Sequence, residues 1–131
     1  MGRALGAREA AHRTPLEAAR ACSRALHARV AEGLVAFHAA TAQAGAPHLR
    51  LELSEPRLDQ KHARAIEFEV RRGRHVGIVT VKARGEVTLV GPFRAGKTEG
   101  PCRTFPMDAA AEIEEALGDF LERLALEAAT P

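Results

Sequence analysis

The apolar residues in the first third of the chain follow the spacing of an amphipathic helix. They recur every three or four positions, so they share about a third of the helical circumference, and they are Leu16, Ala19, Cys22, Leu26, Val30, Leu34 and Phe37. The stretch Thr14-Pro-Leu-Glu17 combines an N-cap hydroxyl, a proline at the first helical position and a capping glutamate, which predicts a start at residue 15. Gly45 and Pro47 predict the end. We therefore expect a helix over residues 15–44, preceded by a frayed, flexible arm over residues 1–13.

From His48 onward the apolar period changes from about 3.6 to 2, which indicates strands. Alternation or apolar runs predict four strands, at residues 48–54, 66–70, 76–82 and 87–91, and a short edge strand at 102–105. A polar loop is expected over residues 55–63. The run from Val76 to Lys82 is apolar on both of its faces, so we expect it to be the central strand, covered on both sides or by a partner.

A second amphipathic helix is expected over residues 108–128, with Asp108 as its N-cap. Its apolar stripe consists of Ile113, Leu117, Phe120, Leu121, Leu124 and Ala128. The predicted fold class is α+β, with the order α-β-β-β-β-(β)-α. Short turns favour an antiparallel meander with the N-terminal and C-terminal helices packed on it. Residues 14–131 are expected to form a single α+β domain.

The segment Gly91-Pro-Phe-Arg-Ala-Gly-Lys-Thr98 fits the P-loop pattern G-x-x-x-x-G-K-[ST] and follows an apolar run. A P-loop requires a helix to begin at its Lys-Thr end, because backbone N–H groups and the helix dipole hold the phosphates. Here Glu99, Gly100 and Pro101 follow, and glycine and proline oppose a helix. We therefore reject a P-loop NTPase and expect a loop that joins the last strands.

Other chemistry-bearing residues form no recognisable catalytic or metal-binding pattern. The two cysteines, Cys22 and Cys102, are far apart, and the six histidines lack the close spacing of a metal site. We expect His27 and His38 to be solvated on the polar helix face. The stretch Asp59-Gln-Lys-His62 could supply an acid–base pair, although polar loops often contain such clusters. We expect no cofactor and no metal, and these residues leave enzymatic activity unsupported rather than excluded.

Charge is distributed unevenly along the chain. Residues 1–47 carry a net charge of +3, residues 48–104 a net charge of +5, and residues 105–131 a net charge of −6. Three arginines, Arg71, Arg72 and Arg74, lie at one expected hairpin tip, and Arg94, Lys97 and Arg103 surround the glycine-rich loop. These six residues are candidate contacts to phosphates or to a protein partner.

The segment from Phe105 to Leu124 resembles part of one repeat of the Pur family of single-strand nucleic-acid binders. The likeness lies in Phe105-Pro-Met107, which leads into Asp108 and the apolar stripe of the helix. It implies nucleic-acid binding. However, the chain has five Phe and no Tyr or Trp, so the aromatic residues on which such proteins stack bases are largely missing.

Taken together, these features favour a small protein-interaction or adaptor module that associates with itself as a homodimer. The alternative is a nucleic-acid-binding protein that uses a basic sheet and hairpin surface. Small-molecule binding or catalysis ranks third. The sequence has neither the apolar core of a signal peptide nor a run of 18 apolar residues, which predicts a cytoplasmic protein with no membrane segment.

Overall fold

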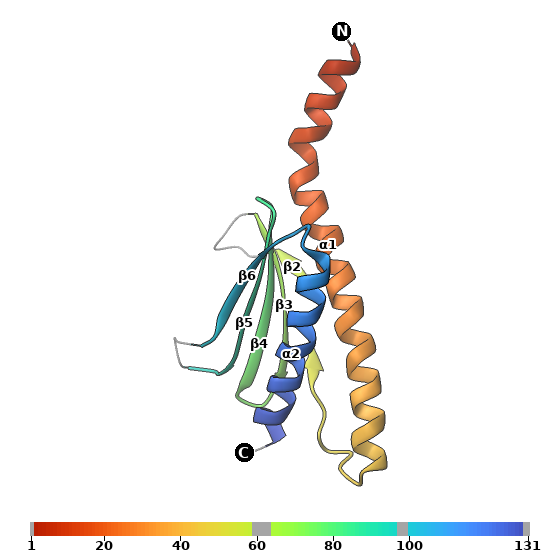
Figure 1. Cartoon of the computed structure of the whole chain (residues 1–131), viewed down its shortest axis with the longest axis vertical. Helices are drawn as coiled ribbons and strands as arrows, with labels where there is room; N and C mark the ends of the chain where they lie inside the picture. The colour runs from red at the N-terminus through yellow and green to blue at the C-terminus, as the bar shows by residue number, and fades with distance from the viewer. Residues whose placement is uncertain (1, 59–63, 97–99, 130–131) are drawn as a thin grey trace.

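The computed structural model describes residues 2–58, 64–96 and 100–129, and it shows two helices packed on one face of an antiparallel sheet (Figure 1). The elements in chain order are α1 (Gly2–Gln43), β1 (Glu52–Leu53), β2 (Arg57–Leu58), β3 (Ala65–Arg72), β4 (His75–Lys82), β5 (Glu86–Arg94), β6 (Cys102–Pro106) and α2 (Ala110–Ala129). The strand order is β1-β3-β4-β5-β6, and β2 also pairs with β3. The predicted α+β class and antiparallel meander are therefore confirmed.

Helix α1 is longer than the sequence pattern predicted. It begins at Gly2, Pro15 lies inside it, and its first turns project beyond the sheet (Figure 1). The predicted start at residue 15 is therefore wrong, and within the arm expected over residues 1–13 the described backbone, residues 2–13, is helical. Residues 2–14 include four alanines and three arginines, and both residue types favour a helix ahead of the predicted start.

The end of α1 follows the prediction. Gly45 has a φ of 80°, and the amide of Ala46 donates to the carbonyl of Thr41 at 2.7 Å while that of Gly45 donates to Ala42 at 3.1 Å. These two bonds form a Schellman motif, in which glycine adopts the left-handed conformation and satisfies the last carbonyl groups of the helix. Gly45 thus ends the helix as its position in the sequence indicated.

Helix α2 places its apolar stripe on the sheet. Its buried residues are Ile113, Ala116, Leu117, Phe120, Leu124 and Ala128, which include five of the six predicted ones; Leu121 is half-buried. The helix starts slightly later than predicted. The amide of Ile113 donates to the carbonyl of Ala109, so Ala109, rather than Asp108, occupies the N-cap position.

Strands β3, β4, β5 and β6 agree closely with the predicted strands, and β4 is the middle strand of the path, as predicted. The helix-covered face carries Ile66, Phe68, Val70, Val79, Val81, Val87, Leu89 and Phe105. They pack against α1 and α2 in one hydrophobic core. Helix α1 packs on β3 and β4, whereas α2 packs on β4 and β5. The described part of the chain therefore covers one face of the sheet and leaves the other open.

The predicted strand at residues 48–54 is reduced to the two residues of β1. The amide of Leu51 donates to Nε2 of His38 at 3.0 Å, and the amide of Leu49 donates to the carbonyl of Ala46 at 3.1 Å. Leu51 is nonetheless buried. The alternating pattern was therefore a correct indication of burial, but the first half of the segment bonds to α1 and to its own turn rather than to a strand. Strand β2, inside the expected polar loop, was not predicted.

Candidate functional site

One face of the sheet is not covered by either helix. Because side chains alternate along a strand, the residues between the core positions of β4, β5 and β6 point away from the helices. The centre of this face carries two apolar and three hydroxyl side chains. We call them the open-face patch: Ile78, Thr80, Thr88, Val90 and Thr104.

The strand registers bring the members of the open-face patch together. Ile78 lies opposite Val90, and Thr88 lies opposite both Thr80 and Thr104. The hydroxyl oxygens of Thr88 and Thr104 are 3.2 Å apart, within hydrogen-bonding distance. Thr88 is 7% exposed because its neighbours flank it, while Ile78 and Val90 are half-buried. The patch is uncharged and low in polarity.

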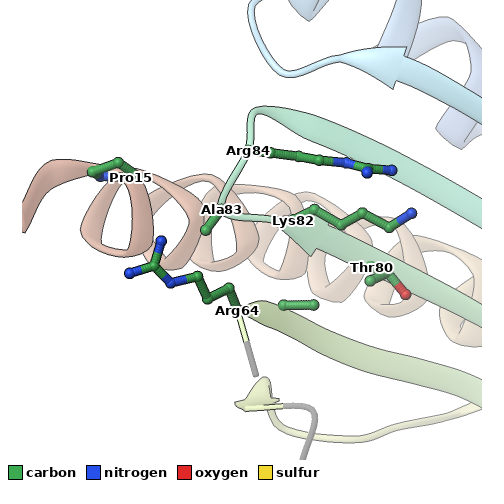
Figure 2. Close-up of a pocket in the computed structure, with 7 residues that line it drawn as sticks. Pro15, Arg64, Thr80, Lys82, Ala83 and Arg84 are labelled. Atoms are coloured by element: carbon green, nitrogen blue, oxygen red, sulfur yellow. The ribbon is translucent and has the colours of Figure 1, made fainter. Parts of the chain in front are cut away.

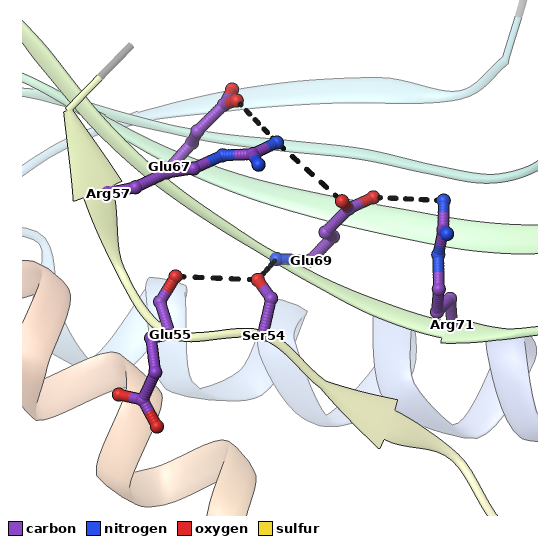
Figure 3. A network of polar contacts seen from close by, with 6 residues as sticks. All are labelled: Ser54, Glu55, Arg57, Glu67, Glu69 and Arg71. Carbon is purple, nitrogen blue, oxygen red and sulfur yellow. Dashed lines mark hydrogen bonds and ion pairs between the residues drawn. The ribbon is translucent and has the colours of Figure 1, made fainter.

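A network of charged side chains borders the patch along β2 and β3 (Figure 3). Arg57 lies 3.5 Å from a carboxylate oxygen of Glu67 and 3.7 Å from one of Glu69, and Arg71 lies 3.4 Å from the other oxygen of Glu69. Ser54 holds the segment between β1 and β2 to β3, since its hydroxyl accepts a hydrogen bond from the amide of Glu69 at 2.9 Å. These charges therefore neutralise one another on the same surface.

Two of the six predicted contact residues lie at the end of β3, on opposite faces of the sheet. Arg71 is exposed and belongs to the charged network of the open face. Arg72 points the other way and donates from Nη1 to the carbonyl of Ala128, in the last turn of α2. A cation at this position stabilises the negative end of the helix dipole. The role of Arg72 in the structure is therefore that of a C-terminal helix cap.

Arg74 and Arg94 are brought together at one end of the sheet, which we call the hairpin tip. Arg94 lies opposite His75 in the β4–β5 register, and the amide of Ala95 donates to the carbonyl of Arg74 at 2.7 Å. Arg103 lies elsewhere, with its guanidinium 5.0 Å from the ring centroid of Phe105, on the helix-covered face. Lys97 lies outside the described residues. The six residues thus do not form one surface.

The described part of the segment that matches the P-loop pattern, residues 91–96, belongs to an antiparallel hairpin. Gly91 to Arg94 complete β5, Ala95 and Gly96 form a turn, and β6 begins at Cys102. Gly91 also donates its amide to the carbonyl of Pro101 at 2.7 Å, which holds the two arms of this connection together. In the described residues that come next, 100–109, no helix begins, and α2 starts only at Ala110; a helix start directly after the motif is the condition on which the P-loop interpretation depended.

The two histidines expected in solvent on α1 are instead half-buried and hydrogen-bonded. Nε2 of His27 lies 2.9 Å from the carbonyl of Ser54, and the His27 ring meets the Phe68 ring edge-on at 5.1 Å. His38 accepts the amide of Leu51, and burial, followed by the nearby charge of Arg50, lowers its pKa. The prediction of solvated rings was wrong because each ring makes a hydrogen bond to the backbone. The bonded groups, in Ser54 and Leu51, belong to the segment that links α1 to the sheet.

Neither cysteine lies in an arrangement that would activate it. Cys22 is half-buried, and burial raises the pKa of its thiol, whereas Cys102 is exposed on β6. Among the described residues, no three His, Cys, Asp or Glu side chains are grouped as metal ligands. The stretch 59–62, considered as an acid–base pair, lies outside the described residues.

A group of cations that the sequence did not indicate lies at the end of the sheet opposite the hairpin tip. One cleft there, of about 790 Å³, is lined by Pro15, Arg64, Ala65, Thr80, Lys82, Ala83 and Arg84. Figure 2 shows Lys82 and Arg84 extending in the same direction from the end of β4 and the following turn, while Arg64 extends toward Pro15 on α1. A second cleft, of about 280 Å³, is lined by Arg20, Arg24, Pro56, Arg57, Leu58 and Ile66.

Comparison with known proteins gives no relative from which to take a function. No family model matches the sequence, and neither a curated protein nor a solved structure shows a significant match. Across the described residues, the structure holds no helix with both the length and the apolar character needed to cross a membrane. The candidate sites therefore rest on their own geometry.

Proposed function

We propose that the protein is a non-enzymatic interaction module that associates with a second copy of itself through the open face of its sheet. The observation that carries this proposal is the one-sided cover of the sheet. Both helices pack on the same face, and the central strand β4 presents Ile78 and Thr80 on the other. A sheet with its central strand uncovered gains stability when a second surface packs on it.

The charge pattern of the open face suits a second copy. The border carboxylates of Glu67 and Glu69 are paired with arginines of the same surface, so two identical faces can approach without an unpaired row of like charges. In a two-fold arrangement each open-face patch would lie against its own copy. An uncharged centre with a polar rim is the usual composition of such interfaces.

The area of the open face indicates how tightly two copies would associate. Four strands about 4.8 Å apart and about eight residues long, at about 3.4 Å per residue, span roughly 20 by 27 Å. That is about 500 Å² on each partner, near the lower limit for a specific interface. We therefore expect a dimer that dissociates at low protein concentration rather than an obligate one.

The proposal is tested by sedimentation over a hundredfold range of protein concentration, centred near 10 µM. The wild type should change from monomer to twice the monomer mass, and Ile78→Glu should remain monomeric, because it places a charge in the centre of the patch. Thr104→Arg, at an exposed position on β6, should weaken the dimer with little risk to the core.

Val35→Glu provides the matched control. Val35 is 70% exposed on α1, so this variant places the same charge on an apolar residue outside the patch and should dimerise like the wild type. A wild type that stays monomeric throughout the range would contradict the proposal. Equal weakening by Ile78→Glu and Val35→Glu would place the interface elsewhere.

A further inference from the structure

We propose that the end of the sheet opposite the hairpin tip binds the phosphodiester backbone of a nucleic acid, without reading its sequence. The site consists of the two clefts described above, which we call the basic clefts. Both clefts are lined by α1 and the start of β3: Pro15 and Ala65 line one, and Arg20, Arg24 and Ile66 line the other. This site does not depend on self-association. Thr80 is the one described residue that lines a basic cleft and also belongs to the open-face patch.

Most of the cations that line the basic clefts have no ion-pair partner in the described part of the chain. Of the six, Arg57 pairs with Glu67 and Glu69, and Arg84 pairs with Glu86 at 2.9 Å. The other four make no ion pair with a described residue, and they are Arg20, Arg24, Arg64 and Lys82. No described lining residue of either cleft is acidic. Like charges gathered in this way attract an anion.

The arrangement suits a chain of phosphates better than one small phosphate compound. The residues contributed by α1 run from Pro15 to Arg24, about 13 Å along the helix at about 1.5 Å per residue. That length corresponds to about four phosphates of one DNA strand, at about 3.4 Å each. A small ligand would instead require donors that converge on one point, whereas Arg64 extends away from Lys82 and Arg84 (Figure 2).

The residues around the clefts also indicate how the ligand would be recognised. No aromatic side chain is among the described lining residues, so this described lining offers no platform on which bases could stack. Arginine and lysine contacts to phosphate hold the backbone but carry no information about the base. Binding should therefore be independent of sequence and strongly dependent on salt.

The test compares two triple variants that remove the same charge from opposite ends of the molecule. The cleft variant is Arg24→Gln, Arg64→Gln and Lys82→Gln, and the tip variant is Arg71→Gln, Arg74→Gln and Arg94→Gln. Each changes the net charge by −3, so a general electrostatic effect would be equal in both. The fluorescence anisotropy of a labelled 20-nucleotide oligothymidine is measured from 50 to 200 mM salt, and the measurement is repeated with a 20-base-pair duplex and with a second sequence.

The wild type should bind both sequences equally at 50 mM salt. The cleft variant should lose about tenfold or more in affinity, and its slope of log affinity against log salt should fall by about 2, or about 0.7 for each lost contact to a single strand. The tip variant should stay within about threefold of the wild type. The two probes show whether a single strand or a duplex is preferred.

Three results would overturn the proposal. They are the absence of wild-type binding at 50 mM salt, an equal loss in both variants, and co-sedimentation with phosphatidylserine vesicles in place of oligonucleotide binding. Thermal unfolding of each variant, expected within a few degrees of the wild type, separates lost binding from lost folding. A dimer that fails to form in the sedimentation experiment would leave these binding results unaffected.

Discussion

The ring of Phe120 on α2 lies directly over the backbone of Gly77 on β4. A Cβ atom at position 77 would meet Cε2 of this ring at 2.9 Å and would lie closer still to Cζ. Phe120 and Gly77 are both buried, in the layer between the helix and the sheet. The glycine therefore lets α2 approach the central strand closely, and the packing distance of this helix depends on the missing side chain.

Gly77→Ala should lower the free energy of unfolding by about 1–3 kcal/mol, because the added methyl group forces Phe120 out of its position. Gly118→Ala is the matched control on α2. It is exposed, with no atom within 4 Å of its added Cβ, and should raise stability by about 0.5–1 kcal/mol because alanine favours a helix. Urea unfolding measures both. A tolerated Gly77→Ala would show that the helix is free to move away from the sheet.

The only two serines of the chain should respond to alanine in opposite directions. Ser23 is completely buried, and its hydroxyl has no hydrogen-bond partner among the described residues, so Ser23→Ala should raise the free energy of unfolding by about 1 kcal/mol. Ser54 accepts the amide of Glu69, and Ser54→Ala should lower it by about 1 kcal/mol. Chemical denaturation of the pair checks this, and a loss of stability in Ser23→Ala would reveal a bond that the hydroxyl makes.

Stability should fall as the pH drops below neutrality, in part because of His38. Burial and Arg50 lower its pKa, so the unfolded chain, with a histidine pKa of about 6.5, binds the proton more readily than the folded one. The contribution of the neutral ring is thus complete above the unfolded pKa and is lost as the pH falls toward the folded pKa.

The measurement is the free energy of unfolding at pH 7.5 and at pH 5.5. His38→Gln keeps an acceptor for the amide of Leu51 but cannot titrate, so the difference between the two pH values should shrink. His48→Gln, at an exposed position, is the control and should leave that difference as in the wild type. An undiminished difference in His38→Gln would assign the pH dependence to other groups.

Arg72 and Arg74, two residues apart, should differ in their effect on α2. Arg72→Ala removes the donor to the carbonyl of Ala128 and should cost about 1 kcal/mol. Arg74→Ala, at an exposed turn position, should change stability by less than about 0.5 kcal/mol. Hydrogen exchange in the last turn of α2 should increase in the first variant alone. Equal exchange in both would remove the capping role of Arg72.

No binding of Mg-ATP or Mg-GTP is expected at millimolar nucleotide, despite the match of residues 91–98 to a P-loop. The first half of the motif lies in strand β5, β6 begins at Cys102 and the next described helix begins only at Ala110, so the described part of this region lacks the helix start that holds a phosphate. Calorimetry tests this. Saturable Mg-nucleotide binding that Lys97→Ala abolishes would restore the enzyme interpretation.

Periodicity was sufficient for the elements that bury one regular face. Strands β3 to β6 and helix α2 were predicted because their apolar positions, such as Phe68 and Leu124, recur with the period of the element. The predicted helix start at Pro15 was wrong. It rested on the four residues Thr14 to Glu17, whereas the alanine-rich stretch before them also favours a helix and continues α1 to Gly2. The prediction of a strand at Leu49 was wrong as well, because burial next to α1 gives the same alternation as a strand.

The basic clefts could not be found by reading along the chain. Arg24, Arg64 and Lys82 are up to 58 positions apart. They line clefts at one end of the sheet because β3 pairs with β4, so that Ala65 lies opposite Lys82, and because α1 adds Arg24. The arginines at 71, 72 and 74 were conspicuous because they are close in sequence. Alternation along the strand and the turn sends their side chains in different directions, so proximity in the chain did not make a site.

The position of α1 ahead of the strands has a consequence for synthesis. The strands that cover its buried face, β3 and β4, end at Lys82, roughly 40 residues after α1, which a ribosome adds in about 2–8 s at 5–20 residues per second. During that time Val30 and Leu34 have no sheet to pack on. By contrast, β3 to β6 and α2 follow one another in short hairpins and can assemble as they emerge. The nascent chain therefore exposes an apolar helix for seconds, and this interval is when chaperone binding or premature aggregation would compete with folding.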